Sequence, residues 1–128
     1  MKPILTKKLY GNTIVSSNNL YAIIQLKKPL NGFKKVISGF YHVIAFLHLP
    51  VGTLVHYDER EKKLRCDLAI VMGFDEDVKS CRSNYDYDFI YRPASIVQPK
   101  YKFDMDLGVC SSGIHFFLEY NDAKNYYL

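Results

Sequence analysis

The sequence predicts an α+β domain dominated by antiparallel β-sheet, a curled sheet or partial barrel, that ends in a short C-terminal helix. Three observations support this class. Eleven Tyr and eight Phe favour strands, because aromatic rings pack well on a pleated surface. Short runs of β-branched and aromatic residues recur between turn residues. A chain of 128 residues, 48% of them hydrophobic, has the size and composition of one folded domain, so residues 1–128 are predicted to form a single globular unit.

The N-terminal half contains most of the predicted strands, and the most apolar of them is central. Strands are predicted at 4–9, 13–15, 20–26, 40–49 and 53–57. In the run 40–49 both the even-numbered and the odd-numbered residues are mainly apolar, which is typical of a strand covered on both faces. Pro29 to Gly32 is predicted to be a turn, and the charged run 58–63 a solvated hairpin tip.

The C-terminal half alternates more regularly. Residues 64–72 predict one strand with Leu64 and Cys66 on one face, and Arg65 and Asp67 as an ion pair on the other. Further strands are predicted at 85–91, 95–97 and 114–118. Asn121 is the predicted N-cap of the final helix. We expect the central uncharged tract and the ribbon at 113–117 to lie side by side as interior strands.

The charge balance and the cysteines indicate which partners and which cellular compartment to expect. The 17 basic and 13 acidic residues leave a mild net charge of +4. Three widely spaced Cys predict neither a disulfide framework nor a zinc knuckle. We therefore expect the protein to reside in a reducing compartment. The N-terminus lacks the apolar run and cleavage site of a signal peptide, so we do not expect secretion.

The uncharged segment 36–57 is long enough to cross a bilayer. It contains three His and the Pro50-Val51-Gly52 break, which a spanning helix would place at membrane depth. Two strands joined by a turn use the same residues without that cost. We therefore expect no membrane insertion.

Several segments together resemble a known family. They are 64–71, 89–93, 97–99, 103–106 and the Cys-x-x-Gly-Ile-His-Phe-Phe pattern at 110–117, followed by Ala123 and Tyr126. In order and spacing they resemble the uncharacterised domain that accompanies pentapeptide repeats in proteins of giant DNA viruses. The resemblance starts near Phe46, and the first forty residues have no counterpart in it. It implies a viral protein, a compact β-rich module, and residence in the host cytoplasm or the virion. That family has no established reaction.

Cys110 and His115 are the candidate catalytic residues. A thiolate needs a neighbouring proton acceptor to react near neutral pH, and a His five residues away across Gly113 is one such acceptor. The alternative is that both side chains are structural, since Cys is often buried and His115 is flanked by Ile114 and Phe116. The structural role is the expected one.

An enzymatic alternative comes from a second resemblance. Residues 113–117, followed by Ala123 and Tyr126, are similar to the Gly-Ile-Tyr-Phe-Ala strand and following helix of ADP-ribosyltransferases. There the Tyr stacks on nicotinamide and a later Glu positions the ribose. His115 stands in place of that Tyr, and the chain ends before such a Glu. The resemblance thus implies at most a degenerate nucleotide-binding site around His115.

No metal site and no cofactor are predicted. Six side chains are acceptable zinc ligands: Cys66, Cys110, His42, His48, His56 and His115. None has short ligand spacing. His42 and His48 share a strand face but stand about 20 Å apart at ~3.3 Å per residue, too far to hold one ion.

The remaining surface candidates point to binding. Lys27, Lys28, Lys34 and Lys35, with Tyr21 and Phe33 nearby, form a candidate nucleic-acid surface, or simply a solvated basic edge. The alternating Tyr and Asp at 85–88 form either a partner-facing stripe or an ordinary half-buried strand. With no convincing set of acid, base and nucleophile, we expect a protein-binding or virion structural module that contacts a protein partner or a second copy of itself.

Overall fold

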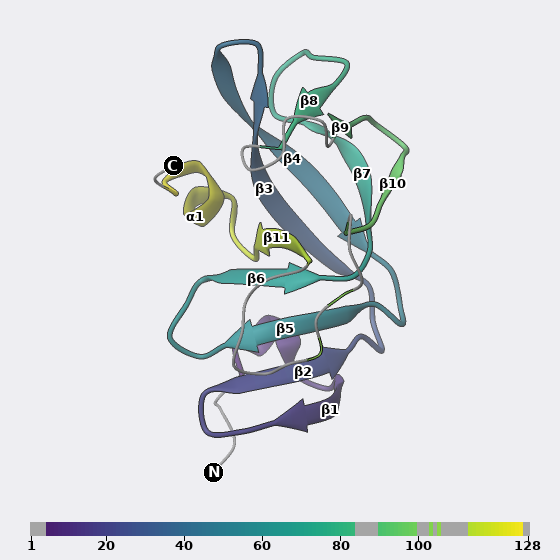
Figure 1. Ribbon diagram of the computed structural model, residues 1–128, viewed down its shortest axis with the longest axis vertical. Coiled ribbons are helices and arrows are strands. Elements are labelled where there is room, and N and C mark those ends of the chain that lie inside the picture. Colours follow the sequence, from purple (N-terminus) through teal and green to yellow (C-terminus); the bar gives the residue numbers. More distant parts are fainter. Residues whose placement is uncertain (1–4, 84–89, 100–102, 104, 106–112, 127–128) are drawn as a thin grey trace.

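The structure is a computed structural model that describes residues 5–83, 90–99, 103, 105 and 113–126. Within these ranges the chain forms one 3-10 turn, eleven strands and one α-helix (Figure 1). Their bounds are η1 Lys7–Leu9, β1 Thr13–Ser17, β2 Tyr21–Gln25, β3 Leu30–Ser38, β4 Tyr41–Leu49, β5 Leu54–Asp58, β6 Lys63–Cys66, β7 Ala69–Phe74, β8 Cys81–Arg82, β9 Ile90–Tyr91, β10 Ile96–Val97, β11 Ile114–Phe117 and α1 Tyr120–Lys124.

All strand pairs are antiparallel, and they form one sheet in the order β1-β2-β5-β6-β11-β3-β4-β7-β10, with β8 pairing β3 and β9. In Figure 1, β2, β5 and β6 run across the view while β3 and β4 cross them steeply. The sheet does not close into a barrel. The predicted α+β class with a short C-terminal helix is confirmed.

The predicted central strand is confirmed as an interior strand, but its neighbour is not the expected one. β4 pairs with β3 on one side and β7 on the other. β3 separates it from β11, so the prediction that the two lie side by side is wrong.

The expected turn at Pro29 to Gly32 is also wrong, because β3 begins at Leu30. A two-residue connection joins β3 to β4, with Gly39 at φ 61° in the first central position, as a type II′ hairpin requires.

The prediction of a strand over 4–9 is wrong for residues 5–9, which the structure describes. Lys7–Leu9 is a 3-10 turn whose Leu9 is fully buried, with the Leu9 amide donating to the Thr6 carbonyl. The Asn12 side chain donates to the Leu9 carbonyl and accepts the Lys27 amide. These side-chain bonds favour a compact turn over an extended strand.

The single strand predicted over 64–72 is also wrong, because it breaks after Cys66. Asp67 accepts the Leu54 amide through Oδ1 at 2.9 Å and donates its own amide to the Leu54 carbonyl at 3.1 Å. The break reverses the alternation, so Val71 is buried and Met72 exposed. The shared strand face on which the predicted Arg65–Asp67 pair depended is lost.

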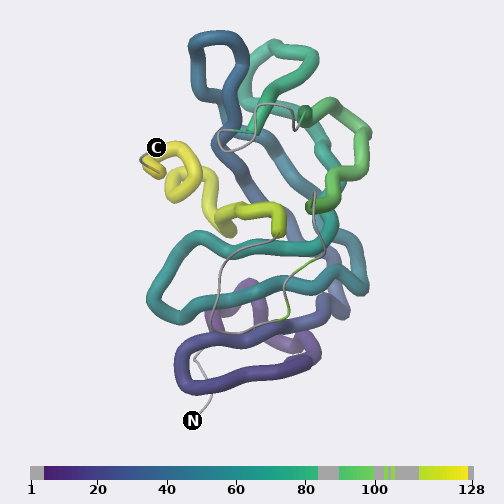
Figure 2. The backbone as a smooth tube through the Cα atoms, in the orientation of Figure 1, coloured from purple at the N-terminus to yellow at the C-terminus, as the bar shows by residue number. Residues whose placement is uncertain are grey.

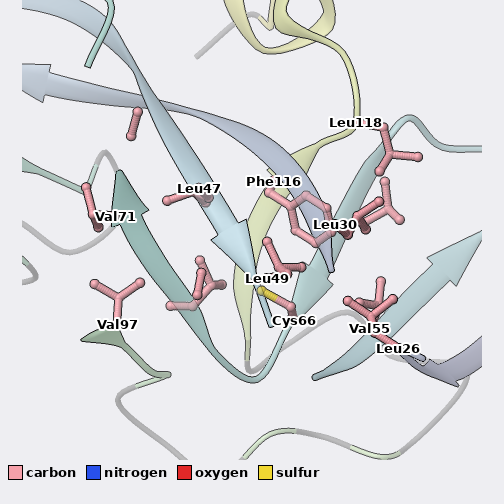
Figure 3. Close-up of a cluster of buried hydrophobic side chains, with 14 of the residues drawn as sticks. Leu26, Leu30, Leu47, Leu49, Val55, Cys66, Val71, Val97, Phe116 and Leu118 are labelled. Carbon is pink, nitrogen blue, oxygen red and sulfur yellow. The ribbon is translucent and has the colours of Figure 1, made fainter. Parts of the chain in front are cut away.

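The core occupies one face of this sheet. Figure 3 shows side chains from β4, β5, β6, β7 and β11 meeting there, among them Leu47, Val55, Cys66, Val71 and Phe116. Neither helix in the described part of the chain has the length and apolar run needed to cross a membrane.

A smaller core lies on the opposite face, under α1. Ala123 is fully buried there beside Ile44 and Phe117. The helix begins at Tyr120 with Glu119 in the cap position, so the predicted cap at Asn121 is two residues too late. Asp75 ties the helix to the sheet: its Oδ1 accepts the Ile44 amide at 2.7 Å, and its Oδ2 accepts the Tyr120 hydroxyl at 2.7 Å.

We expect Asp75→Ala to lower the free energy of unfolding by about 2 kcal/mol, because hydrogen bonds to a charged acceptor contribute roughly 1.5–3 kcal/mol. Tyr120→Phe removes one of the two bonds and should cost about 1 kcal/mol. Urea unfolding measures both. Asp77→Ala, two residues along on an exposed position, is the matched control and should stay within about 0.5 kcal/mol. Equal stability of Asp75→Ala and the control would contradict the tether.

Candidate functional site

His115 lies on β11, in the interior of the sheet, in a row of three basic side chains. The antiparallel register places it opposite Arg65 on β6, and Arg65 opposite His56 on β5. Directly opposite residues project from the same face. Arg65 is fully buried and His56 almost so. The row is therefore buried at Arg65 and His56, while His115 is only partly buried.

Burial, together with the nearby charges of Lys34, Lys63, Arg65 and His56, lowers the pKa of His115 to about 3. The imidazole is neutral at pH 7. Proton transfer is efficient when the pKa of the acid or base is near the working pH. A histidine that accepts a proton only near pH 3 is therefore poorly suited to activate a thiol at neutral pH.

The thiols that the structure describes are also unreactive. Cys66 and Cys81 are free and buried. Burial raises the pKa of Cys66 to about 12 and that of Cys81 to about 11, so both stay protonated at neutral pH. Cys110, the predicted partner of His115, lies outside the described residues. Across the described ranges, no three His, Cys, Asp or Glu side chains converge as metal ligands.

The backbone approaches this basic row closely at Gly113. A Cβ at that position would lie 3.0 Å from the Cβ of Arg65. The Phe103 ring lies 4.7 Å from the guanidinium carbon of Arg65, within the range of a cation–π contact. The absence of a side chain at Gly113 thus allows the backbone to pack against Arg65.

The predicted basic surface is divided by the fold. Lys34 is buried, and its Nζ donates to the His115 carbonyl at 2.9 Å. Lys35 donates to the Lys124 and Tyr126 carbonyls at the end of α1, where a cation also complements the helix dipole. Lys27 and Lys28 alone keep exposed side chains. Neighbouring residues in a strand point to opposite faces. Recognising 30–38 as a strand would therefore have placed Lys34 and Lys35 on different faces of the sheet.

The predicted aromatic surface is divided as well. Tyr21 packs against His56, with ring centroids 5.5 Å apart, and against Arg60. Phe33 is partly buried under α1 against Phe46 and Tyr120. The alternating stripe at 85–88 lies outside the described residues.

Among the described residues, the most exposed aromatic side chains are found instead at the tip of the β3–β4 hairpin. Phe40 is completely exposed and Tyr41 is 77% exposed. Sequence alternation had placed both in the covered central strand, which is wrong for these two positions. The signal that could have located them is Ser38-Gly39, whose turn-forming composition ends the strand just before Phe40. We call Phe40 and Tyr41 the aromatic tip.

Comparison with known proteins yields a family but no characterised relative. No curated protein and no solved structure matches the chain. A family of unknown function (DUF5758) matches residues 20–123, in agreement with the expectation of an uncharacterised domain. Since the match covers most of the chain, this protein belongs to that family of unknown function.

Proposed function

We propose that this chain is a small viral protein that binds another protein, as an adaptor module or as a component of the virion, and that the aromatic tip is its contact. The observation that carries the proposal is the full exposure of Phe40 beside Tyr41. The resemblance to giant-virus domains supports the viral origin. The host cytoplasm and the virion are the proposed locations.

The tip is held rigidly although it is exposed. β3 and β4 pair without interruption from Leu30 opposite Leu49 to Ser38 opposite Tyr41. β8 supports the same hairpin through Arg82, which pairs with Ile37. A rigid anchor loses little conformational entropy when it binds. The hairpin therefore presents its aromatic residues at low cost.

Aromatic side chains of this kind suit a protein partner. Binding hot spots are enriched in Tyr and other large anchors that fill a pocket on the partner. An exposed Phe leaves its whole ring in water, so burial in such a pocket recovers the hydrophobic free energy. We infer a partner with an apolar pocket large enough for one ring.

The test compares Phe40→Ser with wild type as baits in extracts of infected cells and of purified particles. We expect Phe40→Ser to lose the specific partners, with its free energy of unfolding within about 0.5 kcal/mol of wild type, because Phe40 makes no buried contact. Quantitative mass spectrometry of the retained proteins measures the first effect, and urea unfolding the second.

Val51→Ser is the matched control, because Val51 is another exposed apolar residue in a strand connection, between β4 and β5. It should retain the same proteins as wild type. The proposal fails if the Phe40→Ser and wild-type baits retain the same set.

A further inference from the structure

The first hairpin of the sheet, β1–β2, differs in charge from the rest of the chain. From Leu9 to Leu26 there is no Asp, Glu, Lys or Arg, in a chain with 23% charged residues. Four of the large hydrophobic side chains exposed on the surface belong to this segment: Tyr10, Ile14, Val15 and Leu20. Figure 2 places this hairpin at the end of the molecule opposite the aromatic tip.

β1 is also an edge strand. It pairs with β2 on one side, and no other strand among the described residues pairs with it. An edge strand presents unpaired backbone amides and carbonyls, and proteins block such edges with Lys, Pro, very short strands or bulges. β1 has five residues and contains neither Lys nor Pro. Of these devices β1 has only the bulge, between Ile14 and Ser16, and the rest of its length is regular.

The opposite edge of the sheet shows what blocking looks like in this protein. β10 has two residues, with Arg92 and Pro93 before it and Pro99 after it. Proline cannot donate to a ladder, so pairing cannot extend along this edge. β9, which pairs only with β8 among the described residues, is also two residues long. β1 is therefore the longest edge strand in the described part of the chain.

We propose that β1 pairs antiparallel with β1 of a second copy of this chain, which joins two sheets across a two-fold axis. The bulge shifts the register by one residue, so Ile14 and Ser17 are the residues whose backbone groups face away from β2, and self-pairing places Ile14 opposite Ser17 and Val15 opposite Ser16. No charged side chain is opposed, which matters because two copies with a net charge of +4 each repel one another. A contact through the uncharged hairpin keeps that repulsion to a minimum.

This arrangement limits the assembly to two copies. Each chain contributes β1, the longest edge strand among the described residues, and both copies are used in the contact, so the interface is isologous and closed. It leaves the aromatic tips at the far ends of the dimer, free for another partner. The inference is independent of the proposed function.

The experiment is sedimentation equilibrium of the full chain at several concentrations, with light scattering. We expect a reversible equilibrium between monomer and dimer, strengthened by added salt because salt screens the repulsion. Val15→Lys should weaken the dimer by about tenfold or more, since it brings two like charges close together across the two-fold axis. Ile96→Lys makes the same charge change on the exposed position of β10 and should leave the dimer intact.

Circular dichroism and thermal unfolding confirm that each variant is folded, and Thr13→Lys serves as a second edge variant if Val15→Lys does not fold. A monomer at all concentrations would overturn the inference. So would assemblies larger than a dimer, or a dimer that Ile96→Lys disrupts and both edge variants leave unchanged.

Discussion

Replacing Lys34 by Met is expected to raise the free energy of unfolding at pH 7 by about 2 kcal/mol. Burial lowers the pKa of Lys34 from 10.5 to about 8, an effect slightly offset by Cys66 and reinforced by Lys63. Holding the charge inside therefore costs about 3 kcal/mol relative to the unfolded chain. Methionine removes that cost and fills a similar volume, but it deprives the His115 carbonyl of one donor, which costs roughly 1 kcal/mol.

The stability difference between wild type and Lys34→Met is expected to depend on pH. Because the folded pKa lies below the unfolded one, the unfolded chain binds more protons between pH 8 and 10.5. The stability of wild type relative to Lys34→Met should therefore rise through that window and be constant below pH 8. The advantage of the variant is largest at neutral pH and shrinks as pH approaches 10.5. Urea unfolding at a series of pH values measures it.

Lys27→Met is the matched control, because it removes one positive charge from an exposed position. It should change stability by no more than about 0.5 kcal/mol at any of these pH values. If Lys34→Met is less stable than wild type at pH 7, Lys34 contributes more through its hydrogen bond than its burial costs.

Gly32→Ala is expected to lower the free energy of unfolding by roughly 1–3 kcal/mol, the usual cost of overpacking a core. A Cβ at Gly32 would lie 2.6 Å from Cδ2 of Phe116, a fully buried ring in the centre of the core. Gly32 has no positive φ, so alanine meets no backbone strain there. Without the ring, the same change would raise the free energy of unfolding by about 0.4–1 kcal/mol, because alanine lowers the conformational entropy of the unfolded chain.

A double-mutant cycle isolates the contact. Phe116→Leu alone should cost about 1–2 kcal/mol by leaving part of the ring volume empty. In the Gly32→Ala/Phe116→Leu variant the methyl group has room, so the combined loss should be smaller than the sum by about 1 kcal/mol. Strict additivity in urea unfolding would show that Gly32 does not limit the position of Phe116.

Local patterns were sufficient where an element depends on its own residues. The covered strand was recognised because residues 43–49 are apolar on both sets, and it is an interior strand. The closing ribbon at Ile114 to Phe117 and the helix after it were found in place, with an error of two residues at the cap. The strand at 64–72 was mispredicted because Asp67 fits the alternation in sequence but hydrogen-bonds to the Leu54 backbone in the fold.

The candidate site was less predictable. His115 was correctly expected on an apolar strand, yet its neighbours Arg65 and His56 come from strands that lie far away in sequence. The aromatic tip was missed because Phe40 and Tyr41 lead directly into the apolar run at 43–49, and Ser38-Gly39 was not recognised as a turn. Whether an apolar residue at the end of a run is covered depends on what packs over it.

By itself, then, the sequence determined the β-rich α+β class, the positions of most strands and the terminal helix, since side-chain alternation and turn residues act over a few neighbouring positions. Only the tertiary structure decided that β11 inserts between β6 and β3, that Lys34 points inward while Phe40 points outward, and that β1 remains an edge. These outcomes follow from hydrogen bonds between strands far apart in the chain, and local periodicity does not specify which strands will pair.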